Sequence, residues 1–101
     1  MSVFRLSPEA QAELDGIWIH VARESGSLDI ATRVVESIAE PFWLLARHPY
    51  LGCRRDADLR PGLRSLGADD YVIIHRIADD DVVLILRVVH GSRDLDTLFG
   101  C

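Results

Sequence analysis

The sequence predicts an α+β fold, with an N-terminal strand and a helical hairpin packed on one face of an antiparallel β-sheet. Two observations carry this prediction. Apolar residues recur at helical spacing in the first half of the chain, and from residue 63 onwards they alternate with the period of two that is typical of strands. The predicted order is one strand, two helices and three strands. A chain of 101 residues has room for one domain, which we expect to span residues 1–101.

The first helix is predicted by its capping residues and by a single apolar stripe. Ser2–Leu6 alternates polar and apolar residues, which favours a short strand before it. In Ser7-Pro8-Glu9, serine can cap the free amides, proline suits the first helical position, and glutamate faces the positive end of the helix dipole. The stripe consists of Leu14, Ile17, Trp18, Val21 and Ala22. Gly26 is expected to end this helix.

A second helix is expected to begin at Asp29, a residue that can cap it. Its predicted buried stripe consists of Ile30, Val34, Val35, Ile38, Phe42 and Leu45. Pro41 lies inside this pattern, and we expect it to kink or divide the helix near Glu40. Pro49 and Gly52 are expected to end the helix.

The second half of the chain is predicted to form a loop followed by strands. Residues 50–61 are polar and rich in arginine, which is typical of a loop. Strands are expected at 63–66, 71–77 and 82–89, and short turns between them favour antiparallel pairing. His75 and Arg76 are expected at the strand surface. Residues 94–99 could form a short helix or a tail.

The predicted strands are apolar on both faces. In the last strand, Val83, Ile85 and Val89 alternate with Val82, Leu84, Leu86 and Val88. Such a pattern indicates burial on both sides, yet two helices can cover only one side of a sheet. We therefore expect a partner protein to cover the other side. The alternative is that the loop 50–61 folds back over it.

Charge is unevenly distributed along the chain. The net charge is -5 and all 11 basic residues are arginines. Residues 47–64 contain five arginines and only two aspartates, so this segment is locally basic. A net acidic protein is a poor non-specific ligand of nucleic acid, so no direct DNA binding is expected. The local arginines could hold a phosphate or an acidic partner, or could simply line a solvated loop.

Several classes of site are not predicted by this sequence. Cys53 and Cys101 do not have a metal-ligand spacing, and we expect reduced thiols in a cytoplasmic protein. The chain contains no predicted signal peptide or membrane-spanning segment. It contains no glycine-rich phosphate loop either, so no metal and no cofactor are expected.

Nearly the whole chain resembles the ParE/RelE toxin superfamily of type II toxin–antitoxin systems. The resemblance lies in four stretches, each weak alone but fairly specific in their order and spacing: Leu6-Ser7-Pro8-Glu9-Ala10, His48-Pro49-Tyr50-Leu51-Gly52 with the following Leu59–Arg64, the strands Tyr71–Ile74 and Val82–Gly91, and Ser92–Leu95 with Leu98 and Phe99. The last stretch is most similar to ParE. The resemblance implies a helical hairpin packed on an antiparallel sheet. It also implies a cognate antitoxin that wraps the toxin.

The resemblance leaves two targets to be weighed. ParE-like toxins inhibit DNA gyrase, whereas RelE-like toxins are endoribonucleases that cleave messenger RNA on the ribosome. A non-toxic member that only binds an antitoxin is a third reading.

Candidates for a ribonuclease site are Arg64 and Arg87 for the phosphate, His90 as acid or base, and Tyr71 to stack or to donate a hydrogen bond. Each also has a structural alternative: Arg87 could pair with an aspartate across the sheet, Arg64 could lie at the surface or contact the antitoxin, and His90 could cap the strand end.

Two features favour the gyrase inhibitor over the nuclease. Ribonucleases of the RelE type typically carry a lysine-rich surface, and this chain has no lysine. The chain also lacks the C-terminal tyrosine, or histidine–tyrosine pair, that those enzymes often carry. We therefore expect contact surfaces more than catalytic groups. The residues expected to bind the partner or target are Arg54, Arg55, Arg60, Arg64, Arg93, Leu98 and Phe99.

Overall fold

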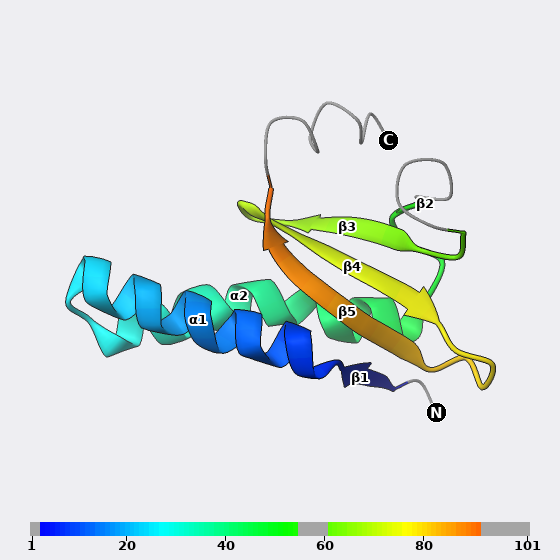
Figure 1. Cartoon of the computed structure of the whole chain (residues 1–101), viewed down its shortest axis with the longest axis horizontal. Coiled ribbons are helices and arrows are strands. Elements are labelled where there is room, and N and C mark those ends of the chain that lie inside the picture. The colour runs from blue at the N-terminus through cyan, green and yellow to red at the C-terminus, as the bar shows by residue number, and fades with distance from the viewer. Residues whose placement is uncertain (1–2, 55–60, 92–101) are drawn as a thin grey trace.

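A computed structural model describes residues 3–54 and 61–91 (Figure 1). The elements are β1 (Phe4–Leu6), α1 (Pro8–Ser25), α2 (Leu28–Arg47), β2 (Cys53–Arg54), β3 (Arg64–Ala68), β4 (Tyr71–Ile77) and β5 (Val83–His90). The two helices form a hairpin that packs on the sheet, and the end of the hairpin projects beyond the strands (Figure 1). This confirms the predicted α+β class.

The five strands form one mixed sheet in the order β1-β5-β4-β3-β2. The strands β2 to β5 pair antiparallel, as expected. β1 instead pairs parallel with β5, with Phe4 opposite Val83 and Leu6 opposite Ile85. The prediction of a purely antiparallel sheet was therefore wrong at this edge. The reason is that the helical hairpin between β1 and the other strands allows β1 to enter the sheet in the same direction as β5.

The capping residues define the helix ends. At the start of α1, the Ser7 hydroxyl accepts a hydrogen bond from the Ala10 amide at 3.0 Å, and Gly26 ends the helix with a φ of 68°. The cap of α2 is Ser27, whose hydroxyl accepts from the Ile30 amide at 3.2 Å, so the expected cap at Asp29 was wrong. Asp29 lies in the first turn, where its charge still favours the helix dipole.

Two further predictions concern Pro41 and the loop 50–61. The helix α2 continues through Pro41 to Arg47 and is therefore not divided there, whereas a kink at Pro41 stays a prediction. The expected loop 50–61 contains the short strand β2, whose Cys53 pairs with Ser65 of β3. Cys53 is also disulfide-bonded, which contradicts the expectation of a reduced thiol. Within the described residues, neither helix is long and apolar enough to cross a membrane.

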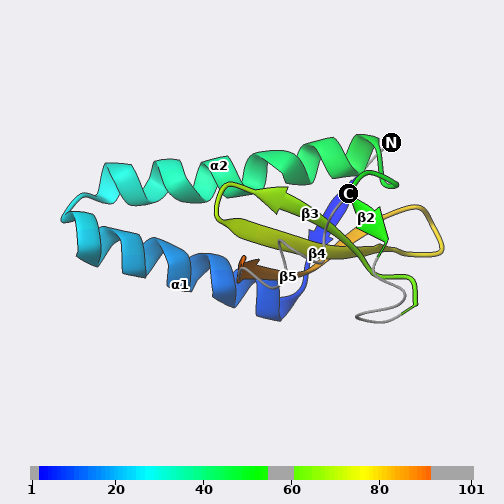
Figure 2. The same ribbon diagram turned by 90° about the horizontal axis from the view of Figure 1, so that it is seen from above.

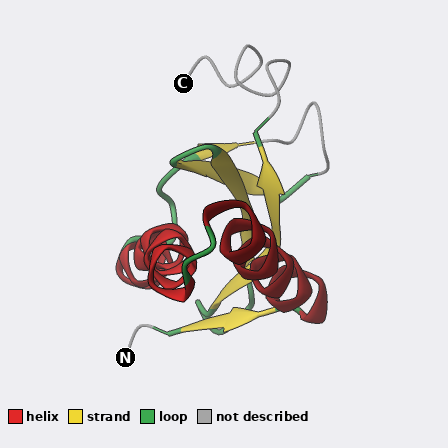
Figure 3. Ribbon diagram, turned by 90° about the vertical axis from the view of Figure 1, so that its left-hand side faces the viewer, coloured by secondary structure: helices red, strands yellow, loops and turns green. Residues whose placement is uncertain are grey.

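The core lies between the helix hairpin and one face of the sheet (Figures 2 and 3). The largest fully buried side chains are Phe42, Ile38, Leu45, Ile73, Ile85, His75, Val83 and Val88. His75 is thus a core residue and not the surface residue that we expected. Its neighbour Arg76 is exposed, as predicted.

A β-bulge changes which residues of β5 face the core. Ile74 pairs with Arg87 and His75 pairs with Ile85, so that Leu86 is an extra residue in the ladder. Val83, Ile85 and Val88 consequently face the helices, and Val89 turns to the other side. The simple alternation predicted from the sequence, which grouped Val89 with Ile85, was wrong beyond the bulge.

Candidate partner-binding surface

The face of the sheet opposite the helices, here called the helix-free face, is apolar but incompletely covered. Because side chains alternate along a strand, Ile74 of β4 and Leu84 and Val89 of β5 lie on this face. All three are half-buried, whereas Ile73 and Ile85 on the helix side are completely inaccessible. The sheet therefore retains apolar surface that no described element of the chain covers.

A groove of about 660 Å³, here called the β4–β5 groove, crosses this face. Its apolar lining includes Leu63, Ile74 and Leu86, and its charged lining includes Glu9, Arg76 and Arg87. Leu86 and Arg87 both line the groove because the bulge places these successive residues on the same side. The groove thus combines half-buried apolar side chains with two arginines, which suits an amphipathic segment carrying acidic residues.

Arg87 is held in place by Glu13 of α1. The Glu13 carboxylate accepts hydrogen bonds from Nε of Arg87 at 2.9 Å and from Nη2 at 2.7 Å. Burial raises the pKa of Glu13, but the hydrogen bonds from Arg87 and from the Val88 amide, with the charge of Arg87, outweigh it and leave the pKa below its ordinary value. The hydrogen bonds to Glu13, together with its negative charge, raise the pKa of Arg87. The partner of Arg87 is therefore Glu13 of α1, and not an aspartate across the sheet.

Glu13 also completes the edge of β5. β1 pairs with β5 only as far as Ile85. Beyond that point, the Ser7 hydroxyl donates to the Leu86 carbonyl at 2.7 Å, and the Glu13 carboxylate accepts from the Val88 amide at 2.9 Å. Side chains from the start of α1 therefore continue the hydrogen bonding that the short strand β1 leaves off.

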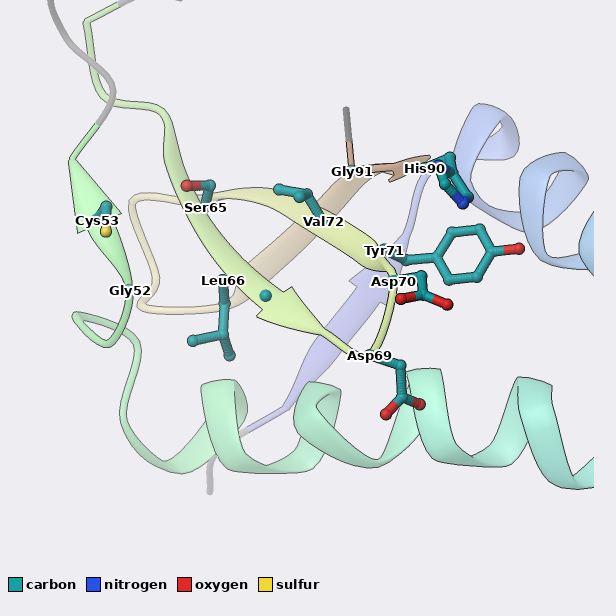
Figure 4. Close-up of a pocket in the computed structure, with 11 residues that line it drawn as sticks. Gly52, Cys53, Ser65, Leu66, Asp69, Asp70, Tyr71, Val72, His90 and Gly91 are labelled. Atoms are coloured by element: carbon teal, nitrogen blue, oxygen red, sulfur yellow. The ribbon is translucent and has the colours of Figure 1, made fainter. Parts of the chain in front are cut away.

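A second groove, of about 590 Å³ and here called the β3–β4 groove, is lined by residues of β2, β3 and β4 and by the end of β5 (Figure 4). Cys53 lies at one end of it, and His90 and Gly91 lie at the other (Figure 4). Asp69 and Asp70 of the β3–β4 turn make this second end acidic. The Ser37 hydroxyl of α2 donates to Asp69 at 2.7 Å, which ties the turn to the helix.

Arg64 holds the connection between α2 and β2. Its guanidinium donates hydrogen bonds to the carbonyls of Tyr50, Leu51 and Gly52, and lies 5.7 Å from the centre of the Tyr50 ring. Gly52 has a φ of 89°, and a Cβ atom there would lie 2.2 Å from the Ser65 carbonyl oxygen. Arg64 therefore has a structural task that sequence reasoning did not foresee.

His75 lies beneath this connection. The side chain is completely buried, and neither ring nitrogen has a hydrogen-bond partner. Burial, together with repulsion from the nearby charge of Arg64, lowers the pKa of His75 to about 4, although the Pro49 backbone near the ring acts in the opposite direction. The ring is therefore neutral near pH 7.

The four candidates for a ribonuclease site are not brought together. Tyr71 and His90 pair across β4 and β5, with their ring centres 5.2 Å apart in a T-shaped contact. Arg64 pairs with His75 near the other end of β4, and Arg87 lies on the helix-free face. Arg64 and Arg87 both bind protein oxygens, and Arg64 lies towards the opposite end of the sheet from Tyr71 and His90.

The expected partner-binding arginines are only partly placed. Arg54 is exposed on β2, and with Arg64 it lines a hollow beside the β4–β5 turn, where Ala78 and Asp81 also line it. Arg55, Arg60, Arg93, Leu98 and Phe99 lie outside the described residues. Among the residues that the structure describes, no group of three or more potential metal ligands occurs.

Sequence reasoning assigned no role in this site to four residues: Glu13, Arg76, Gly52 and His75. One signal could have pointed to Glu13: Glu9 and Glu13 lie four residues apart, and like charges at this spacing repel unless a cation faces them. The cation is Arg87, whose pKa is also raised by the charge of Glu9.

Comparison with known proteins agrees with this geometry. Residues 4–95 match the family model described as ParE toxin of type II toxin-antitoxin system, parDE. Toxin ParE1 of Mycobacterium tuberculosis is 30% identical over 95 residues, covering 94% of this chain and 95% of that protein. Toxin ParE3 of Caulobacter vibrioides is 33% identical over 98 residues, covering 97% of this chain and 94% of that protein.

Solved structures show the same fold. A chain of the chromosomal ParDE system from P. aeruginosa superposes with a TM-score of 0.78 at 24% identity, over 91% of this chain and 98% of that one. A chain of the toxin–antitoxin complex RelBE2 from Mycobacterium tuberculosis gives a TM-score of 0.61 at 24% identity, over 89% of this chain and 98% of that one. The fold, the family match and these relatives together show that the chain belongs to the ParE toxin family of type II toxin–antitoxin systems.

Proposed function

We propose that this chain inhibits DNA gyrase in the bacterial cytoplasm and is neutralised by a cognate antitoxin that covers the helix-free face. The observation that carries the antitoxin proposal is the apolar surface of Ile74, Leu84, Leu86 and Val89, which stays half-buried in the described part of the chain. The P. aeruginosa relative is a ParDE toxin–antitoxin system, which supports a partner of the same kind here.

The β4–β5 groove is the proposed antitoxin site. Leu63, Ile74 and Leu86 supply apolar contacts for one side of an amphipathic segment. Arg76 is exposed at the groove, and Arg87 uses only its Nε and Nη2 groups on Glu13, so that its other N–H groups are available to an acidic partner. An antitoxin segment with apolar residues on one side and carboxylates beside them fits this surface.

A ribonuclease is the weaker candidate on the geometry of this chain. Cleavage at a 2′-hydroxyl needs a base, an acid and cations around one phosphate. Arg64 is engaged by three backbone carbonyls, Arg87 is engaged by Glu13, and Tyr71 and His90 lie elsewhere on the sheet. A binding protein requires no such cluster, which supports gyrase inhibition over RNA cleavage.

The target is tested with purified toxin in two assays. We expect the protein to block supercoiling of relaxed plasmid by gyrase, and to leave messenger RNA intact on translating ribosomes. His90→Ala should retain the gyrase inhibition. If messenger RNA is cleaved and supercoiling proceeds unchanged, the gyrase proposal fails.

The antitoxin surface is tested by growth and by binding. Induced toxin should arrest growth, and co-expression of the antitoxin encoded beside it should restore growth. Arg76→Glu should weaken the toxin–antitoxin complex at least about tenfold, because it places a like charge against an acidic segment. Arg33→Glu, at an exposed position of α2, is the matched control and should bind normally. Equal binding by both variants would contradict the proposed site, and a chain that never arrests growth would point to a non-toxic family member.

A further inference from the structure

The outer side of α2 carries a pair of large apolar residues that the fold leaves exposed. Trp43 and Leu44 have exposed fractions of 62% and 47%. Their neighbours Phe42 and Leu45 are buried in the core, so the exposed pair points away from it. α2 runs along the outside of the molecule in Figure 2, and the exposure of the pair shows that no described element covers it.

Two opposite charges flank this apolar pair on the same side of the helix. Glu40 lies three residues before Trp43, and Arg47 lies three residues after Leu44. Residues spaced i, i+3, i+4 and i+7 share one face of a helix, here called the α2 outer face. Glu40 and Arg47 are both exposed, and neither side chain forms an ion pair with another described residue. Both charges are therefore available to a partner.

The α2 outer face is complementary to itself. When two identical helices pack antiparallel about a two-fold axis, residue i of one meets residue j of the other, and j meets i. An axis midway between positions 43 and 44 pairs Trp43 with Leu44 of the second copy. The same axis pairs Glu40 with Arg47 of the second copy, and each pairing occurs twice. We propose that this chain self-associates through the α2 outer face, with the two α2 helices antiparallel.

The apolar centre of this face is already ordered for binding. The ring of Phe4 in β1 packs edge to face against Trp43, with ring centres 4.7 Å apart. Because this contact restricts the tryptophan before a partner arrives, less side-chain entropy is lost on association. A hollow of about 420 Å³ beside Trp43, lined by Ser37, Pro41 and Leu44 among others, has room for the tryptophan of the second copy. The projecting ring and the hollow thus lie on the same face, as self-association requires.

The dimer leaves the β4–β5 groove open in both copies. The α2 outer face belongs to the helix layer, whereas the groove lies on the side of the sheet away from the helices (Figure 3). One helix from each copy buries less than about 1,200 Å² in total, the size of a transient interface, so the dimer forms reversibly with concentration. Two antitoxins can then bind one toxin dimer. This last consequence rests on the proposed function, whereas the dimer itself does not.

Charge exchange across the two-fold axis tests the dimer without any activity assay. Sedimentation equilibrium of the whole chain should show a monomer–dimer equilibrium. Glu40→Arg and Arg47→Glu each bring like charges together at both ends of the contact, and each should weaken the dimer at least about tenfold. An equimolar mixture of these two variants should form a heterodimer, and the variant carrying both substitutions should dimerise like the wild-type chain. Arg23→Glu, at an exposed position of α1, is the matched control and should dimerise normally. Circular dichroism checks that every variant is folded.

Other results would overturn the dimer. A wild-type chain that stays monomeric at every concentration at which it is soluble would do so, and so would a dimer that neither charge variant weakens. If Glu40→Arg lowers the affinity for the antitoxin or for gyrase and leaves self-association unchanged, the α2 outer face binds that protein and not a second copy. If the charge exchange behaves as expected but the chain neither inhibits gyrase nor arrests growth, the dimer stands and the proposed function fails.

Discussion

Glu13 and Arg87 lie 74 residues apart in the sequence, and in the structure one carboxylate receives two hydrogen bonds from the arginine. The same carboxylate accepts from the Val88 amide, so it serves both a side chain and the edge of β5. The two partners therefore do not contribute equally to stability.

We predict that Glu13→Ala destabilises the protein more than Arg87→Ala. Losing Glu13 leaves the part-buried Val88 amide without its acceptor, which costs about 1–3 kcal/mol. Arg87 is half exposed, and losing it removes mainly a solvent-screened ion pair, at about 0.5 kcal/mol. Urea unfolding measures both values, with Glu36→Ala at an exposed position of α2 as the control. Equal losses for Glu13 and Arg87 would contradict the dual role.

The buried ring of His75 predicts a loss of stability in acid. Its pKa is about 4 in the folded chain against an ordinary value of 6.5, so the unfolded chain binds the proton first. The contribution of this group to the free energy of unfolding is complete above pH 6.5 and is lost as the pH falls towards 4. Below pH 4, both the folded and the unfolded chain bind the proton, so the contribution does not change further. The total is at most about 3 kcal/mol.

His75→Leu tests this assignment. The variant removes two buried nitrogens without partners, so we expect equal or higher stability at pH 7 and a flatter profile between pH 6.5 and 4. Unfolding in urea at several pH values measures the slope. His20→Leu, at an exposed position of α1, should keep the wild-type profile. A variant at His75 that retains the full slope would show that another group causes it.

Two glycines offer a matched pair of alanine substitutions. Gly52→Ala places a Cβ 2.2 Å from the Ser65 carbonyl in a backbone with a φ of 89°, and we expect a loss above about 2 kcal/mol. Gly16 lies within α1, where an added Cβ meets nothing within 4 Å, so Gly16→Ala should stabilise by up to about 1 kcal/mol. Thermal unfolding should shift in opposite directions. Tolerance of alanine at position 52 would mean that the close approach of β2 to β3 is not required.

Local patterns in the sequence predicted the elements that depend on neighbouring residues. The predicted strand Tyr71–Ile77 matches β4 at both ends, and Ser7 and Gly26 cap α1 as expected. Ser27 was missed as the cap of α2 because Asp29, two residues later, has an equally good capping side chain. When two good capping residues lie this close together, residue type alone does not determine which of them caps the helix. The position at which the preceding helix ends also matters.

Long-range relationships could not be predicted in this way. The bulge at Leu86 exchanges the roles of Val88 and Val89, and nothing in the apolar run of β5 marks the extra residue. His75 alternates with Ile73, a pattern that places it in the core, but a histidine without a hydrogen-bond partner is an unusual core residue. The candidate site was predicted least well, because Arg64 and Arg87 are engaged by groups from distant segments.

The last prediction concerns two adjacent residues of β4 that face opposite sides of the sheet. Ile73 is fully buried in the core, so Ile73→Ala should cost about 2–5 kcal/mol in stability. Ile74 is half-buried and lines the β4–β5 groove, so Ile74→Ala should cost less than about 1.5 kcal/mol. Ile74→Asp should nevertheless abolish antitoxin binding, because it places a carboxylate in the apolar part of the groove. Urea unfolding and titration with the antitoxin separate the two effects. If the antitoxin binds Ile74→Asp as tightly as the wild-type chain, the helix-free face is not its docking surface, even though the same face is apolar.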